Sequence, residues 1–256
     1  MRIAVLGLGE AGSIYARGLA ERGADVVGFD PVVLETPSGV TRSTSIGEAV
    51  AGAELVLSLV GATAAETVLG EALPRMSAPT PFADFNTGAP EQKHRLATRA
   101  VAAGIPFADV AVMAPVPRAG IGTELLASGD GAETAADALG GYGLPIRVVG
   151  ADAGDAAGLK LVRSVFMKGL AGLVFESLAA AEKIGATAEV RAQLAAELGP
   201  DGDALVQRLL DGTRQHAARR EHEMLDTREF LRALGSPTRM TDGTIAWLRS
   251  LRTGDS

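Results

Sequence analysis

Residues 1–31 of the chain read MRIAVLGLGEAGSIYARGLAERGADVVGFDP, and this stretch decides the fold. Residues 3–6 (IAVL) are all apolar, without the alternation of a half-exposed strand, and predict a strand covered on both faces. A glycine-rich hexapeptide follows, then a stretch of helical composition, then a second apolar strand at residues 26–29. This order predicts the first β-α-β unit of a doubly wound α/β fold.

The hexapeptide GLGEAG has the glycine spacing of a dinucleotide-binding turn. Its first glycine allows the tight turn, its second lets the backbone approach a pyrophosphate, and its third lets the next helix pack close to its strand. The unpaired N–H groups and the positive dipole at the start of that helix attract phosphate. We therefore expect the turn to bind a dinucleotide cofactor through Gly7, Leu8, Gly9, Glu10, Ala11 and Gly12.

Asp30 ends the second strand, eighteen residues after Gly12, which is close to the ~20 expected of an acid that binds a ribose diol. Its alternative role is that of a turn residue before Pro31. The carboxylate would repel the 2′-phosphate of NADP, and residues 31–35 (PVVLE) contain no arginine to hold one. The sequence therefore predicts NAD as the cofactor and disfavours NADP.

The composition limits the number of domains and the class of ligand. A chain of 256 residues exceeds the usual ~100–200 residues of one domain, so we expect two. Apolar residues make up 47% of the chain and aromatic residues only 4%, so the core must consist mainly of small aliphatic side chains. The net charge of −7 argues against binding to nucleic acid or to an anionic membrane. We expect a small-molecule substrate.

Several kinds of site are excluded by residue content. The chain has no cysteine, which excludes disulfides, zinc–thiolate sites and a thiol nucleophile. Of its three histidines, His216 and His222 would lie on different faces of one helix, so we expect no metal site. The first strand begins at the second residue, and no uncharged apolar run of ~20 residues occurs, so we expect a cytoplasmic protein without a membrane span.

Strands and helices continue to alternate after Asp30, which is typical of a parallel sheet. Residues 155–184 contain no proline and carry apolar residues at helical spacing, so they predict one long helix. We expect a Rossmann domain over residues 1–153 and an all-helical domain over residues 154–256, joined by that helix. The remaining strands of the first domain are expected at residues 54–60, 81–85, 105–113, 121–127 and 146–149.

Two loops follow expected strands at the edge of the sheet where the glycine turn lies. They are residues 60–63 (VGAT) and 86–88 (NTG). Ligands of parallel sheets bind at the carboxyl ends of the strands. We therefore expect Val60 and Thr87 to contribute to the cofactor site, with ordinary loop chemistry as an equal alternative.

Two further stretches carry a resemblance to a known family. Residues 154–164 (GDAAGLKLVRS) form a glycine turn into the long helix, and residues 109–125 (DVAVMAPVPRAGIGTEL) begin within the strand expected at residues 105–113 and continue through the segment after it. With the hexapeptide, these stretches resemble the β-hydroxyacid dehydrogenases, an NAD(P)-dependent family that includes 3-hydroxyisobutyrate dehydrogenase, tartronate semialdehyde reductase and 6-phosphogluconate dehydrogenase. The resemblance spans most of the chain. It is greatest to a short branch, often labelled 6-phosphogluconate dehydrogenase-like, whose C-terminal helical domain has no assigned function.

The resemblance implies roles for residues of the long helix. In the family, a lysine there is the catalytic acid and base, and an asparagine four residues later helps to place the substrate. Lys160 matches the lysine, and Ser164 stands at the asparagine position on the same helix face. A solvated helix lysine is the alternative for Lys160. Lys168, about 80° around the helix, is the reserve candidate for proton transfer.

Residues 109–125 match the family pattern D-x-P-V-S-G-G followed by G-T-L in spacing but not in content. Met113 stands where the family has a substrate-contacting serine, and Ala114-Pro115 replaces two glycines. The resemblance implies a less polar substrate site in which Arg118 holds an anionic group, unless it is an ordinary exposed loop arginine. The substrate-binding residues implied are Met113, Ala114, Arg118 and Thr123.

These motifs together predict an NAD(P)-dependent oxidoreductase that transfers a hydride between nicotinamide and a small hydroxy or oxo compound. Two alternatives stay open. One is an imine reductase, which shares the fold but typically replaces the family's lysine. The other is a non-catalytic NAD-binding sensor, which would need neither Lys160 nor Ser164. The family dimerises through its helical domain, and the broad apolar surface of the 155–184 helix also predicts a homodimer.

Overall fold

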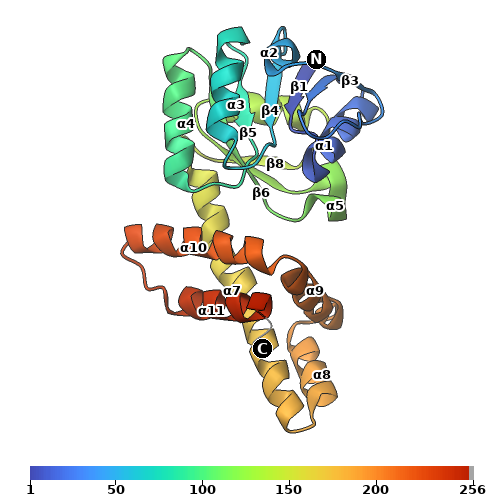
Figure 1. The fold of residues 1–256 in the computed structure, drawn as a ribbon, viewed down its shortest axis with the longest axis vertical. Helices are drawn as coiled ribbons and strands as arrows, with labels where there is room; N and C mark the ends of the chain where they lie inside the picture. The colour runs from blue at the N-terminus through green and yellow to red at the C-terminus, as the bar shows by residue number, and fades with distance from the viewer. Residues whose placement is uncertain (254–256) are drawn as a thin grey trace. The chain divides into compact units, whose positions relative to one another are not determined.

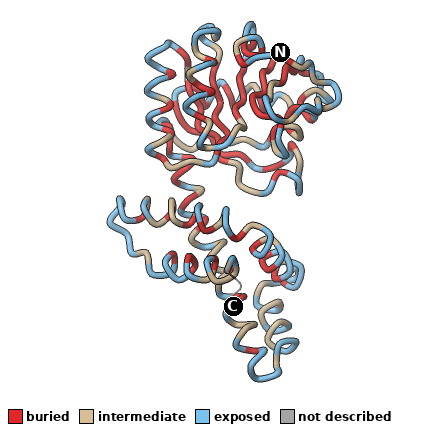
Figure 2. Tube along the Cα trace, in the orientation of Figure 1, coloured by how far each residue is buried: buried red, intermediate tan, exposed pale blue. Residues whose placement is uncertain are grey.

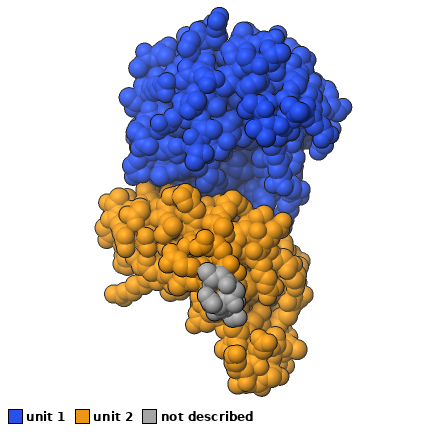
Figure 3. Space-filling model, viewed as in Figure 1, with its two compact units in different colours: residues 1–160 blue, residues 161–256 orange. Residues whose placement is uncertain are grey.

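The computed structural model describes residues 1–253, which divide into two compact units, residues 1–160 and residues 161–256 (Figure 3). The division falls inside the long helix α7 (Asp155–Lys183), seven residues after the expected domain boundary at residue 153. The reason is that the first turns of α7 pack on the first unit, where Ala156 and Ala157 are buried. The predicted helix over residues 155–184 is confirmed to within one residue.

The first unit contains an eight-stranded sheet among the described residues, in the order β3-β2-β1-β4-β5-β6-β7-β8 (Figure 1). Its neighbouring strands are parallel except β6 and β7. The strands are β1 (Arg2–Leu6), β2 (Asp25–Phe29), β3 (Val40–Arg42), β4 (Leu55–Ser58), β5 (Phe82–Asp84), β6 (Phe107–Val112), β7 (Leu125–Ser128) and β8 (Ile146–Gly150).

The prediction of a parallel doubly wound sheet is therefore confirmed except at one strand pair. The connection from β6 to β7 holds only the four-residue helix α5 (Val116–Ala119) and a 3-10 turn (Gly120–Gly122). A crossover to a parallel strand usually needs a longer helix, and this short connection instead returns the chain beside β6 in the opposite direction. The strand expected from residue 121 begins only at Leu125, because Ile121 lies in the 3-10 turn.

Helices cover both faces of the sheet, which explains why β1 has no polar alternation. Ile3 and Val5 pack into one core cluster with Tyr15 and Leu19, whereas Leu6 packs into a second cluster on the opposite face. The inner strands β1, β4, β5, β6 and β7 are accordingly buried along most of their length, whereas β3 and β8 at the two edges of the sheet are not (Figure 2). The helices are α1 (Glu10–Glu21), α2 (Ile46–Val50), α3 (Ala65–Ala72), α4 (Pro90–Ala102), α5 and α6 (Ala132–Gly140), with a 3-10 turn at Leu73–Arg75.

The second unit is helical throughout its described residues. The later part of α7 packs with α8 (Thr187–Glu197), α9 (Gly202–Gln215), α10 (Ala217–Ala233) and α11 (Arg239–Thr253). Its larger core cluster joins Val174 and Phe175 of α7 to Val206 and Leu210 of α9. Within the part of the chain that the structure describes, α7 alone is long and apolar enough to cross a membrane, judged by length and composition only, a test that core helices of soluble proteins also pass.

Candidate cofactor site and active site

The glycine turn between β1 and α1 combines two tightly packed glycines with one that faces open space. Gly7 has a φ of +93°, and a Cβ there would lie 2.5 Å from the carbonyl oxygen of Leu59. A Cβ at Gly12 would overlap the carbonyl oxygen of Gly7, so the start of α1 lies directly against the turn. A Cβ at Gly9 would meet no atom within 4 Å. Gly9 is also the N-cap of α1 and has no side chain to cap the N–H groups of the first turn.

The side chain of Asp30 joins the end of β2 to the glycine turn. One carboxylate oxygen accepts a hydrogen bond from the backbone N–H of Leu8 at 2.7 Å, and the other accepts from Val32 and Val33 at 2.8 and 2.9 Å. Burial alone would raise the pKa of Asp30, but these three N–H groups and the nearby charge of Arg42 outweigh it and lower the pKa. Asp30 therefore stays ionised at neutral pH and presents its charge beside the turn.

A pocket of about 410 Å³ opens next to Asp30, and it contains an arginine. Residues 31–35 contain no arginine, but β3 brings Arg42 beside Asp30, so the expected absence of a nearby arginine is wrong. The guanidinium of Arg42 donates to the carbonyl oxygens of Asp30, Val33 and Leu34 at 2.6, 2.9 and 3.3 Å. A strand of three residues is too short to show a periodic pattern, so neither β3 nor the position of Arg42 could be predicted from local sequence. The pocket is lined by Phe29, Asp30, Pro31, Leu34, Arg42, Ser43 and Thr44.

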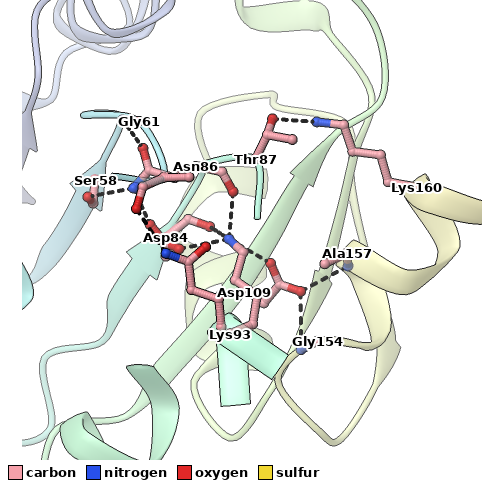
Figure 4. A network of polar contacts seen from close by, with 12 residues as sticks. Ser58, Gly61, Asp84, Asn86, Thr87, Lys93, Asp109, Gly154, Ala157 and Lys160 are labelled. Atoms are coloured by element: carbon pink, nitrogen blue, oxygen red, sulfur yellow. Dashed lines mark hydrogen bonds and ion pairs between the residues drawn. The ribbon is translucent and has the colours of Figure 1, made fainter. Parts of the chain in front are cut away.

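The loops that follow β4 and β5 are held together by Asn86. Its side-chain oxygen accepts a hydrogen bond from the backbone N–H of Gly61 at 2.6 Å. Its amide nitrogen donates to Ser58 Oγ at 3.0 Å and to the carboxylate of Asp84 (Figure 4). Val60 and Thr87, the two loop residues that the sequence suggests, are the chain neighbours of Gly61 and Asn86 at the carboxyl edge of the sheet.

Below this edge lies a buried lysine that sequence reasoning did not find. Lys93 of α4 is only 1% exposed, and its ammonium donates to the carboxylate of Asp84 at 2.7 Å and to the carbonyl oxygens of Asp84 and Asn86 at 3.1 and 2.7 Å. Asp109 Oδ1 lies 3.0 Å from the same nitrogen. Burial alone would lower the pKa of Lys93, but Asp84 and Asp109 outweigh it and raise the pKa, so the lysine stays charged.

The first turns of α7 are bound to the same network. Asp109 Oδ2 accepts hydrogen bonds from the backbone N–H groups of Gly154 and Ala157 at 3.2 and 2.9 Å. One turn later, Lys160 is partly exposed and its Nζ donates to Thr87 Oγ1 at 3.1 Å (Figure 4). The structure thus brings two predicted residues, Lys160 and Thr87, into contact at the edge of the sheet that carries the glycine turn.

The residues expected to bind substrate between β6 and β7 have mixed environments. Met113 is partly buried and packs with Ala111, Leu126 and Ala156, and Ala114 beside it is also partly buried. Thr123 is buried and its hydroxyl donates to the carbonyl of Gly120 at 2.8 Å, so it has a structural partner. Arg118 is exposed on α5.

In the second unit, Ser164 belongs to an ionisable cluster on α7 and α10. Lys168 Nζ donates to Ser164 Oγ at 2.9 Å and lies 2.8 Å from Glu223 Oε2. Burial lowers the pKa of Lys168, although Glu223 opposes the effect. Burial raises the pKa of Asp226 in the same cluster. Ionisable groups with shifted pKa values often mark functional sites. Glu223 and Asp226, the acidic residues of this cluster on α10, were not identified from the sequence.

Comparison with known proteins decides the family. Residues 2–143 match the family described as the NAD binding domain of 6-phosphogluconate dehydrogenase. The chain belongs to this family. Residues 181–251 also match DUF1932, a domain of unknown function. The family match indicates an NAD-binding domain in the first unit.

Solved structures show the same fold along the whole chain. MTH1747, a conserved protein of unknown function described as structurally similar to 3-hydroxyacid dehydrogenases, has a TM-score of 0.81 and 28% identity, covering 100% of this chain and 98% of that one. A 3-hydroxyisobutyrate dehydrogenase from Mycobacterium tuberculosis, solved with L-serine, has a TM-score of 0.81 and 19% identity, covering 100% and 99% of the two chains. An imine reductase from Myxococcus stipitatus, in complex with NAD⁺, has a TM-score of 0.68 and 18% identity, covering 99% and 93%.

A curated relative matches a smaller part of the chain. An uncharacterized 28.5 kDa protein from Methanothermus fervidus is 31% identical over 90 residues, which is 35% of this chain and 36% of that protein. The match therefore spans about a third of that relative's length.

Proposed function

We propose that the protein transfers a hydride between nicotinamide and the carbon of a small hydroxy or oxo compound, with Lys160 as the general acid and base. The observation that carries this proposal is the 3.1 Å hydrogen bond from Lys160 Nζ to Thr87 Oγ1, at the same edge of the sheet as the glycine turn. A lysine fixed by a hydroxyl at a parallel sheet's carboxyl edge is placed for proton transfer to a ligand bound there.

The first unit has features that fit a dinucleotide. Gly9 faces open space at the uncapped start of α1, where backbone N–H groups can bind a pyrophosphate. Asp30 places an ionised carboxylate beside the pocket, where it can accept hydrogen bonds from a ribose diol. When bound, nicotinamide supplies or accepts the hydride. Lys160 then donates a proton to the carbonyl oxygen during reduction and takes it back during oxidation.

We propose NAD rather than NADP as the preferred cofactor, on the charges around the pocket. Asp30 is one carboxylate there, and Glu48 is a second one close by. The hydroxyls of Ser43 and Thr44, which line the pocket, both donate to Glu48 at 2.9 and 2.7 Å. Arg42 is the group that favours a 2′-phosphate, but it donates to three backbone carbonyls. The two carboxylates would repel the 2′-phosphate of NADP, and the donors of Arg42, Ser43 and Thr44 already have protein acceptors.

One experiment separates this function from its two alternatives. The purified protein is incubated with NADH and with a panel of aldehydes, 2- and 3-oxoacids and cyclic imines, while NADH absorbance is followed. We expect oxidation of NADH with a carbonyl compound. Turnover of imines alone would identify an imine reductase, which the partly buried, less polar segment at Met113 and Ala114 would suit. NADH binding without turnover of any compound would support a sensor.

We also propose a homodimer formed through α7. Val162, Phe166 and Leu173 lie on one face of this helix, at positions i, i+4 and i+11, and are 48%, 68% and 51% exposed. Large apolar side chains gathered on one helix face are typical of a protein interface. A second copy of the chain presents the same face, as the two-fold symmetry of most dimers requires.

A further inference from the structure

Lys93 has contacts with both sides of the proposed catalytic pair. On one side, its ammonium donates to the carbonyl oxygen of Asn86, the residue directly before Thr87. On the other side, it lies 3.0 Å from Asp109, which accepts the N–H groups of Gly154 and Ala157 at the start of α7. Lys160 follows Ala157 by less than one helical turn.

The geometry closes a ring around the hydrogen bond between Lys160 and Thr87 (Figure 4). One half runs from Lys93 through Asn86 to Thr87, and the other runs through Asp109 and the first turn of α7 to Lys160. Asp84 and Asp109 are register partners on neighbouring strands, so the sheet itself fixes their separation. The positions of both Thr87 and Lys160 therefore depend on contacts with the buried ammonium of Lys93.

Stability alone does not require such an arrangement. Burying an ammonium and two carboxylates has a large desolvation cost, and well-packed apolar residues often stabilise a fold as well as a buried ion pair does. A charged cluster does what apolar packing cannot, because directed hydrogen bonds fix orientation as well as distance.

We propose that Lys93 is a positioning residue, which acts through Asp109 and Asn86 to hold Lys160 against Thr87. The proposal rests on the proposed function of Lys160 for its effect on turnover. The placement of Lys160 can be measured without any substrate. The positioning role of Lys93 and the catalytic role of Lys160 can therefore be refuted separately.

The decisive variant is Asp109→Asn. The carboxylate of Asp109 serves Lys93 with one oxygen and α7 with the other. An amide of the same size has a single acceptor, so it cannot serve both. The change also leaves Lys93 and Asp84 as a neutral pair, whereas the native cluster of Lys93, Asp84 and Asp109 carries one excess negative charge, so this variant should fold.

Lys93→Met is the companion variant, and it leaves two buried carboxylates without a counter-charge. The matched control is Asp130→Asn. Asp130 is exposed, and its carboxylate accepts a hydrogen bond from the backbone N–H of Phe107, which an amide oxygen can also accept.

The placement of Lys160 is read by NMR of protein labelled at the lysine side chains. The chain has four lysines, so the Lys160 resonance is assigned by its loss in Lys160→Met. In Asp109→Asn we expect this resonance to move toward its position in Thr87→Val, which lacks the hydroxyl. In Asp130→Asn it should stay in place. For turnover, we expect kcat to fall roughly ten- to a hundredfold, as for a misplaced catalytic group, with the Kd for NADH changed less than about threefold.

The outcomes distinguish the two claims. A Lys160 resonance at its native position in folded Asp109→Asn overturns the positioning role. A shifted resonance with native turnover supports the positioning role and contradicts catalysis by Lys160. If Lys93→Met fails to fold, Asp109→Asn alone decides.

Discussion

Replacing Gly9 by alanine should separate cofactor binding from folding. Gly9 has φ −63° and ψ −166°, which an alanine can adopt, and a Cβ there would meet no atom within 4 Å. A glycine-to-alanine change at a compatible backbone position stabilises a protein by about 0.4–1 kcal/mol, because the unfolded chain loses conformational freedom, but alanine is a poorer N-cap than glycine, which offsets this gain. For a chain of this size we therefore expect the Tm to stay within about 4 °C of the native value.

Cofactor binding, in contrast, should weaken. The open space at Gly9 is where the backbone would approach a pyrophosphate, so a methyl group there separates the phosphate from the N–H groups of α1. Losing one hydrogen bond to a charged group costs about 1.5–3 kcal/mol, which raises the Kd for NADH by a factor of about ten to a hundred and fifty. Kd is measured by NADH fluorescence titration and Tm by calorimetry.

Two further glycines provide the comparison. Gly140, at the exposed end of α6, also has open space, so Gly140→Ala should change neither Kd nor fold. Gly12→Ala should lower Tm, because its Cβ would overlap the carbonyl of Gly7. Native NADH affinity in Gly9→Ala would refute the assignment of the turn as a pyrophosphate site.

Three other predictions concern the cofactor, the assembly and pH. The native protein should bind NADH more tightly than NADPH, and Asp30→Ser should narrow the difference; equal or tighter NADPH binding by the native protein would contradict this. Light scattering at micromolar concentration should give a dimer mass, and Phe166→Glu should shift it toward the monomer, whereas a native monomer would exclude the dimer. Because burial lowers the pKa of Lys168 below the ordinary value of 10.5, the unfolded chain holds this proton over a pH window in which the native state has lost it. The free energy of unfolding should therefore rise with pH across that window, and Lys168→Met should flatten the rise in urea titrations.

The sequence was most informative where a local pattern determines the structure. The glycine spacing and the apolar run before it predict β1, the turn and α1, because each residue's role depends on its immediate neighbours. The absence of proline over residues 155–184 similarly predicts α7. The short strand β3 escaped prediction because three residues show no period, and with it the position of Arg42 was missed.

The network around Lys93 depended on contacts that sequence spacing does not reveal. A lysine in the first turn of a helix is normally solvated, and Lys93 is buried only because α4 packs where β5 and β6 pair Asp84 with Asp109. Two aspartates on neighbouring buried strands were a usable signal, since unpaired carboxylates are rarely buried. The antiparallel β7 was missed for a related reason, because the direction of a strand depends on the connection before it and not on its own residues.

The central claim, that Lys160 handles the proton in a hydride transfer, is tested most directly by Lys160→Met. Methionine keeps most of the length and the apolar stem but removes the ammonium that donates to Thr87. Lys183→Met, at the exposed end of α7, is the matched control. On the carbonyl substrate found with NADH, kcat of Lys160→Met should fall by ~10²–10⁴, as for a lost general acid and base, while the Kd for NADH stays near that of the native protein and of Lys183→Met. Near-native kcat in Lys160→Met would contradict the claim and transfer the proton role to Lys168 or to water.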